Sequence, residues 1–362
     1  MLYLDRNENL FGAAPECLRI LRTADAATLG TYSRDFLRGV KSTLSETLAQ
    51  QLEIPERRIL LSYGSEDMLK QTVHCCLSAG DRMLIPQYSW WYYQSVASEC
   101  GGVTVEYPLE RMQQPAPAFL YNAEEIIGAV RNTAPKLLLI ASPNNPTGNA
   151  LSLDGLKKIL DKCASTRVVI DEAYFGFNDE LFESLPQLTR QFPHLAVLRT
   201  FSKLYALAGM RIGYACVGEQ YEKLTAYSAR YLGYNTLSEQ LALAALRSKE
   251  YYNEIGKTIA NERERFYSFF DATDPCIAYR SVANFILVKI PTEHMAPLSE
   301  HLRRAEIAVK FYSEGGLASH IRITIGTPSQ NSLLLQALSD FRYRFAAHAA
   351  TANHQSKLYN LQ

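Results

Sequence analysis

The sequence predicts an α/β fold built around a mostly parallel β-sheet. Short apolar runs that fit buried parallel strands occur at 137–141, 168–170 and 195–198. They alternate with segments of helical periodicity at 65–77 and 153–163, in which apolar residues recur on one face. Because neighbouring parallel strands need crossover connections, strands separated by helices indicate a mostly parallel sheet.

The length of the chain predicts two lobes. It has 362 residues, of which 47% are hydrophobic, and this exceeds what a single core usually supports. We expect a large lobe over 33–246, followed by a long polar helix after Lys249. This helix would lead into a smaller lobe with strands at 283–290 and 321–325. The tail 346–362 is expected to be disordered.

Composition excludes several classes of function. Lysine plus arginine equals aspartate plus glutamate at 37 each, which gives no electrostatic reason to expect nucleic acid or an anionic membrane. No signal-like segment and no bilayer-spanning apolar stretch is present, so we expect a protein of the cytoplasm. The seven cysteines and seven histidines form neither C-x-x-C nor H-E-x-x-H, and we expect no metal site. The glycine-rich motifs of nucleotide cofactors are also missing.

Lys203 is the most informative position for chemistry. It follows Thr200 and Ser202, just past the C-terminal end of the run 195–198, with Arg211 eight residues later. Open α/β sheets bind ligands at this edge. An amine in that place can form a Schiff base with an aldehyde, and hydroxyls with a guanidinium can bind a phosphate. The alternative reading is a solvated loop lysine.

Two further motifs lie upstream in a consistent order. Asp171 ends the run 168–170, and a buried carboxylate needs a cationic partner, such as a protonated pyridine nitrogen. A helix cap is the alternative for Asp171. Loop 142–148, Ser-Pro-Asn-Asn-Pro-Thr-Gly, follows 137–141. Its amides could donate to a ring oxygen, although it could also be only a turn.

Together these motifs resemble a known family. Ser-Pro-Asn-Asn-Pro-Thr-Gly, Asp-Glu-Ala-Tyr and Thr-Phe-Ser-Lys followed by Ala-Leu-Ala-Gly-Met-Arg-Ile-Gly-Tyr are similar to motifs of the fold type I, pyridoxal-phosphate-dependent class I/II aminotransferases. The histidinol-phosphate aminotransferase-like branch is the most similar, because 6–12 and 321–326 resemble its terminal motifs. The resemblance covers about 4–345. It implies a seven-stranded sheet in the large lobe, a small α/β C-terminal lobe comprising 1–32 and 247–345, and a homodimer with shared sites.

The resemblance also implies roles at the cofactor. Lys203 would form the Schiff base with pyridoxal 5′-phosphate and move the proton between substrate and cofactor. Asp171 would pair with the pyridine nitrogen, and Asn145 and Tyr174 would hydrogen-bond the phenolic oxygen of the ring. Tyr88 would stack on the ring face.

Further residues would bind the phosphate and the substrate. The residues expected at the phosphate are Gly64, Ser65, Glu66, Thr200, Ser202 and Arg211, with Tyr32 from the neighbouring subunit. A helix N-terminus, here at Ser65, independently suits a phosphate. Arg322 would bind the substrate carboxylate by a two-pronged contact, and Asn145 and Lys310 would also face the substrate.

Two departures from the family concern the distal end of the substrate. The chain begins only a few residues before the motif at 6–12. Lys310 stands where the family often has arginine, and a lysine lacks the fork geometry of a guanidinium. We therefore expect histidinol phosphate to be a poor substrate. The alternatives to transamination are elimination or cyclisation, as in capreomycidine-synthase-like relatives, and decarboxylation, as in threonine-phosphate-decarboxylase-like relatives. A non-enzymatic cofactor-binding protein is a remote alternative.

Overall fold

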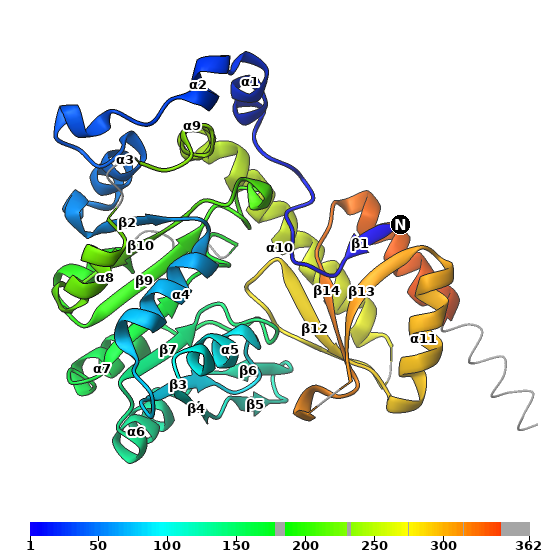
Figure 1. Ribbon diagram of the computed structural model, residues 1–362. Coiled ribbons are helices and arrows are strands. Elements are labelled where there is room, and N and C mark those ends of the chain that lie inside the picture. The colour runs from blue at the N-terminus through cyan, green and yellow to red at the C-terminus, as the bar shows by residue number, and fades with distance from the viewer. Residues whose placement is uncertain (178–184, 230–232, 274, 314, 342–362) are drawn as a thin grey trace, which may run out of the picture.

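A computed structural model describes residues 1–177, 185–229, 233–273, 275–313 and 315–341. Two β-sheets with their helices form two lobes, which are joined by the long helix α10 (Lys249–Asp271) (Figure 1). The tail predicted at 346–362 lies outside the described residues.

The large sheet has seven strands in the order β2-β10-β9-β8-β7-β3-β4. Only β10 runs antiparallel to its neighbours, so the predicted, mostly parallel seven-stranded sheet is confirmed. The strands are β2 (Ile59–Ser62), β3 (Arg82–Pro86), β4 (Val103–Tyr107), β7 (Leu137–Ala141), β8 (Arg167–Asp171), β9 (Leu195–Thr200) and β10 (Gly213–Val217).

Helices cover both faces of this sheet, which explains its continuous apolar strands. In β7, Leu137 and Leu139 pack in one core cluster with α4 and α5, whereas Leu138 and Ile140 pack in another with α6 and α7. The helices are α4 (Ser65–Cys76), α5 (Tyr92–Glu99), α6 (Ala123–Thr133), α7 (Leu153–Lys162) and α8 (Glu222–Tyr227).

The smaller sheet has the order β1-β13-β14-β12-β11. Strand β1 pairs in parallel with β13, so the N-terminus belongs to this sheet (Figure 1). Its strands are β1 (Leu2–Leu4), β11 (Ile277–Tyr279), β12 (Phe285–Lys289), β13 (Ile307–Tyr312) and β14 (His320–Thr324), and α11 (Thr292–Arg304) packs beside them. A hairpin of β5 (Glu110–Met112) and β6 (Ala118–Leu120) follows β4.

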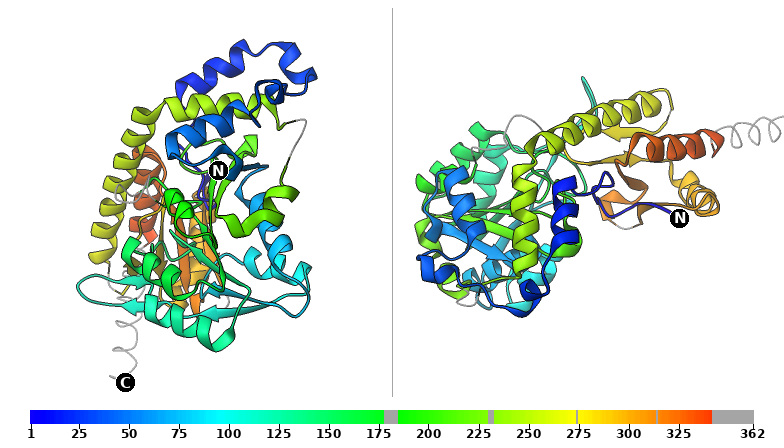
Figure 2. Two further views of the ribbon diagram at one scale, coloured as in Figure 1. Left: turned by 90° about the vertical axis from the view of Figure 1, so that its left-hand side faces the viewer. Right: turned by 90° about the horizontal axis from the view of Figure 1, so that it is seen from above.

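Between β1 and β2 the chain crosses to the large lobe. There α1 packs along α9 (Figure 2). The helices of this layer are α1 (Pro15–Thr23), α2 (Ala26–Gly30), α3 (Thr43–Leu52) and α9 (Thr236–Arg247).

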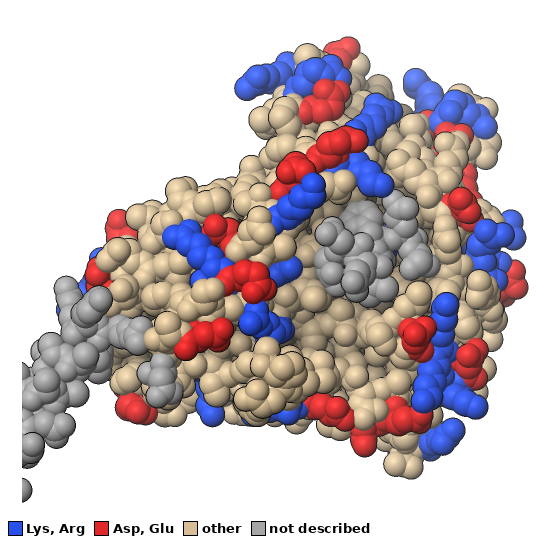
Figure 3. All heavy atoms as spheres, turned by 180° about the vertical axis from the view of Figure 1, so that it is seen from behind, with Lys and Arg blue, Asp and Glu red and all other residues tan. Residues whose placement is uncertain are grey.

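The surface carries both signs of charge. Lysine and arginine are interspersed with aspartate and glutamate on the face seen from behind (Figure 3). Across the described ranges, no helix combines the length and the apolar character that crossing a membrane requires.

Candidate active site

A cavity of about 1260 Å³ is lined by residues of both lobes. The strands β3, β7, β8 and β9 are parallel, so their carboxyl ends meet at the edge that lines this cavity. The predicted site residues that line it are Ser65, Glu66, Tyr88, Asn145, Asp171, Tyr174, Thr200, Ser202, Lys203, Arg211, Lys310 and Arg322. Gly64 lies beside the cavity, and Tyr32 does not line it.

Lys203 presents its amine to this cavity. It follows the end of β9 at Thr200, and its Nζ donates a hydrogen bond to the Arg6 carbonyl at 3.0 Å. The same nitrogen lies 5.5 Å from the centroid of the Tyr174 ring. The N-terminal segment therefore lies directly beside the lysine.

Asp171 is a buried carboxylate without a cationic partner in the described parts of the chain. It ends β8, is 5% exposed, and accepts hydrogen bonds from the Tyr93 hydroxyl at 2.8 Å and the Ala173 N–H at 3.0 Å. Burial raises the pKa of the Asp171 carboxyl, although these two hydrogen bonds oppose the shift. A cationic ring nitrogen bound here would supply the missing charge.

A cradle for an anion lies at the start of α4. Gly64 has φ +88°, and a Cβ atom on it would lie 2.7 Å from Nη2 of Arg211. The Arg211 guanidinium therefore sits against the helix N-terminus, with its Nη1 3.5 Å from Ser202 Oγ, which in turn lies 2.9 Å from Thr200 Oγ1. Helix N–H groups, a guanidinium and hydroxyls converge, as a phosphate requires.

Arg322 and Asn145 connect the two lobes inside the cavity. Arg322, on β14, is 7% exposed and donates hydrogen bonds from Nη1 to Asn145 Oδ1 and from Nη2 to the Asp5 carbonyl. Its Nε is buried and has no hydrogen-bond partner within the described ranges of the chain. Because an arginine only donates, Asn145 must direct its oxygen to Arg322, which leaves the amide nitrogen to donate elsewhere. The free Nε can take an anionic acceptor.

The other predicted residues are placed as follows. Lys310 lies opposite Arg322 in the β13–β14 ladder, with Nζ 5.9 Å from the centroid of the Tyr312 ring. The Tyr88 hydroxyl accepts a hydrogen bond from Arg111. The stacking of the Tyr88 ring on a cofactor ring stays a prediction. Tyr32 is 72% exposed, and its expected role in a neighbouring site is not tested within one chain.

Sequence reasoning missed two residues of this site. Tyr93 donates to Asp171, but nothing in the run of aromatic residues at 88–93 indicated which ring would do so. Asn7 is buried, and its amide donates to the Tyr174 hydroxyl at 2.9 Å. Asn7 lies in the motif 6–12, which indicated the family without assigning a role to any residue in it.

These features fit pyridoxal 5′-phosphate. Asp171, which has no cationic partner among the described residues, suits the ring nitrogen of this cofactor. The cradle at Gly64 and Arg211 suits the phosphate, and the Lys203 amine suits the aldehyde.

Comparisons with known proteins agree with this assignment. The family model for class I and II aminotransferases matches residues 1–338. The histidinol-phosphate aminotransferase of Symbiobacterium thermophilum is 32% identical over 93% of this chain and 90% of its own. Two solved structures share the fold. Histidinol-phosphate aminotransferase from Sinorhizobium meliloti in complex with pyridoxal 5′-phosphate has a TM-score of 0.82 and 24% identity, covering 95% of this chain and 91% of its own. L-threonine-O-3-phosphate decarboxylase from Porphyromonas gingivalis has a TM-score of 0.79 and 21% identity, covering 95% and 100%.

Proposed function

Because the chain belongs to the class I and II aminotransferases, we propose that it transfers the amino group of an α-amino acid to a 2-oxo acid, with pyridoxal 5′-phosphate as its cofactor. The observation that carries the proposal is the convergence of Lys203, Asp171 and Arg322 on one cavity. The cavity thereby combines an amine that can transfer a proton, a negative charge for the cofactor ring and a binding site for the substrate carboxylate.

The cofactor, when bound, supplies an electron-withdrawing ring that stabilises negative charge at the substrate Cα. Asp171 keeps the ring nitrogen protonated, because a buried carboxylate is costly without a cation. Lys203 Nζ takes the proton from Cα and returns it during transfer. Arg211 and the N-terminus of α4 hold the phosphate.

The substrate proposal rests on Arg322 and Lys310. Arg322 has a buried Nε that no described residue hydrogen-bonds, and a carboxylate can accept from Nε and an Nη together. Lys310 offers a second positive charge in the same cavity but lacks a fork for a phosphate. We therefore propose an α-amino acid as substrate and histidinol phosphate as a poor one.

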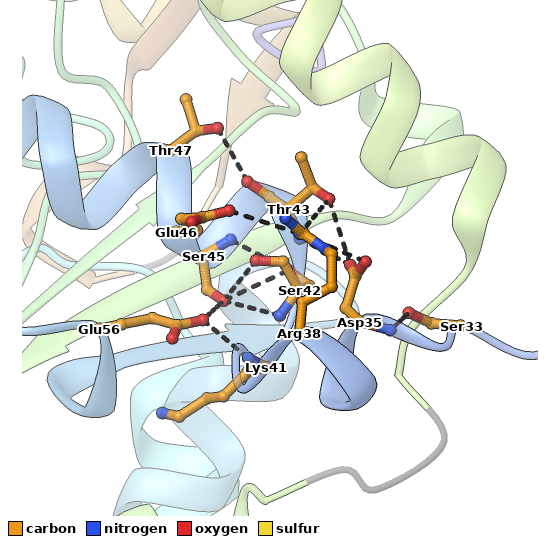
Figure 4. A network of polar contacts seen from close by, with 10 residues as sticks. All are labelled: Ser33, Asp35, Arg38, Lys41, Ser42, Thr43, Ser45, Glu46, Thr47 and Glu56. Carbon is orange, nitrogen blue, oxygen red and sulfur yellow. Dashed lines mark hydrogen bonds and ion pairs between the residues drawn. The ribbon is translucent and has the colours of Figure 1, made fainter.

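We also propose that the protein is a cytoplasmic homodimer. Leu29, Tyr32 and Leu37 are all more than two-thirds exposed, and an exposed apolar set suits a second copy. The segment that follows Tyr32 is fixed by a polar network (Figure 4), in which Asp35 accepts from the Thr43 N–H at 2.7 Å. Tyr32 is thus carried by an anchored segment.

The test is a product analysis. The protein is incubated with a panel of amino acids, histidinol phosphate and 2-oxoglutarate, and the products are identified by mass spectrometry. Transamination yields glutamate and one new 2-oxo acid, and Lys203→Ala loses both products and any borohydride-reducible bond to the cofactor. Release of carbon dioxide, ammonia or water without formation of glutamate would instead indicate decarboxylation, elimination or cyclisation.

A further inference from the structure

The hairpin β5–β6 reaches from the large lobe to the small one (Figure 1). Its Pro117 carbonyl accepts from the Arg280 N–H at 2.8 Å. The Phe119 ring packs 4.7 Å from the ring of Tyr279 in β11, measured between centroids. The hairpin is therefore part of the contact between the lobes.

Arg111, on β5, connects the two walls of the cavity. Its Nη2 donates hydrogen bonds to the Tyr88 hydroxyl at 3.0 Å and to the Gly316 carbonyl at 3.1 Å. Tyr88 belongs to the large lobe and Gly316 to the small one, and both line the cavity. The guanidinium carbon also lies 5.2 Å from the Tyr88 ring centroid and 5.3 Å from that of Phe119. One side chain thus holds both walls.

The two walls are in close contact where Arg111 joins them. A Cβ atom on Gly316 would lie 2.6 Å from both Cε1 and the hydroxyl of Tyr88. The Tyr88 carbonyl accepts a hydrogen bond from the Asn144 side-chain amide at 3.1 Å. On the other wall, the carbonyl of Leu317 lies 3.1 Å from His320 Nδ1. Each wall is therefore held by contacts within its own lobe, and Arg111 hydrogen-bonds both walls.

We propose that Arg111 is a positioning residue that fixes Tyr88 against Gly316 and so sets the width of the cavity on the substrate side. This inference rests on the proposed function, because substrate is expected to occupy that cavity. Arg111 itself does not line the cavity. Its loss should weaken substrate binding and leave the chemistry at Lys203 unchanged.

Steady-state kinetics with the best amino-acid substrate test the proposal. In Arg111→Ala we expect KM to rise about three- to tenfold, as loss of two hydrogen bonds from an exposed arginine allows, while kcat stays within about twofold. Arg111→Lys should recover only part of this, because an ammonium lacks the planar guanidinium that packs near the Tyr88 and Phe119 rings. Tyr88→Phe removes one acceptor, so its effect and that of Arg111→Ala should not add in the double variant.

Arg280→Ala is the matched control. Arg280 lies beside the same hairpin, pairs with Glu264 at 3.0 Å, and does not line the cavity. We expect its KM to equal that of the unmodified protein. An unchanged KM in Arg111→Ala, or an equal rise in Arg280→Ala, would overturn the proposal.

A measurement without substrate separates this inference from the proposed function. Amide hydrogen exchange of the cofactor-loaded protein should speed up in Arg111→Ala at Ala318, whose N–H donates to the Gly315 carbonyl at 3.1 Å, and should not change around Ser65. If the unmodified protein transaminates no amino acid, the proposed function fails, and exchange still decides whether Arg111 connects the two walls. Unchanged exchange at Ala318 would show that it does not.

Discussion

At the scale of single residues, two adjacent carboxylates at the end of β8 have different environments. Glu172 forms a buried ion pair with Arg199 at 2.8 Å, whereas Asp171, among the residues that the structure describes, meets only the neutral donors Tyr93 and Ala173. Burial raises the pKa of both carboxyls, and the charge of Arg199 opposes this rise at Glu172. Glu172 is therefore satisfied within the protein, and Asp171 is left to pair with a ligand.

Asp171→Ala should therefore reduce turnover without unfolding the protein. We expect kcat to fall by roughly three orders of magnitude, because stabilisation of charge in the transition state is lost. The measurement is single-turnover kinetics on protein whose cofactor content is known. Glu172→Gln should instead mainly lower the free energy of unfolding, by about 3–5 kcal/mol, since the buried Arg199 loses its carboxylate partner. Near-normal turnover in Asp171→Ala would remove Asp171 from the site.

The sequence could predict that Asp171 ends a buried strand but not which residue pairs with Glu172. A carboxylate after an apolar strand is a local signal. The pair with Arg199 depends on β8 and β9 lying side by side, in a register that sets Asp171 opposite Leu198. Tyr93 reaches Asp171 from 78 positions away, and no local pattern encodes that contact.

At the scale of elements, the long buried strands were predictable and the short ones were not. Continuous apolar runs predicted the strands at 137–141 and 195–198. Apolar residues that recur on one face predicted the helix at 153–163. Strand β1 and the hairpin β5–β6 have three residues per strand, too few for a pattern. The direction of β10 is set by its connection to β9, which local residue preference does not encode.

The N-terminus of α4 gives a prediction about the cofactor. Gly64→Ala should weaken cofactor affinity by at least about tenfold, because the new Cβ would displace the Arg211 guanidinium from the phosphate cradle. Gly80→Ala is the matched control, with φ +82° and no described atom within 4 Å of the added Cβ. Both variants place a side chain on a residue with positive φ, and only Gly64→Ala contacts Arg211. Equal cofactor affinity in the two, measured by titration of the apoprotein, would contradict the assignment.

The first turn of α9 gives a prediction about pH. Burial raises the pKa of Glu239 to about 7; the hydrogen bond with Ser42 opposes the shift and nearby Asp35 adds to it. Below pH 4.5 the carboxyl is protonated in both folded and unfolded chains. Between pH 4.5 and 7 only the unfolded chain ionises, so the folded state loses stability, by about 3 kcal/mol in total.

Glu239→Gln removes this loss. Its unfolding free energy relative to the unmodified protein should therefore increase from about pH 5 to about pH 7 and level off above that. Urea unfolding at fixed protein concentration measures this difference. A difference that does not change with pH would show that Glu239 does not titrate in this range.

At the scale of the whole molecule, the cavity is assembled from both ends of the chain. Asn7 reaches Tyr174 across 167 positions, and Arg322 reaches the Asp5 carbonyl across 317. Family resemblance could predict most of the residues that line the cavity, because they lie within the motifs. It could not predict these connections, which exist only once β1 pairs with β13 in the small lobe.

The proposed homodimer makes a quantitative prediction. If Tyr32 of one subunit completes the site around Lys203 of the other, a dimer of one Lys203→Ala chain and one Tyr32→Ala chain contains one intact site and one doubly damaged site. Equal mixing after unfolding and refolding gives hybrids as half of all dimers. The mixture should therefore recover about one quarter of the unmodified activity, although each variant alone is impaired. If Tyr32 acted within its own chain, mixing would restore nothing. Size-exclusion chromatography with light scattering on the same samples is the control for assembly, and a fully active monomer would contradict the proposal at once.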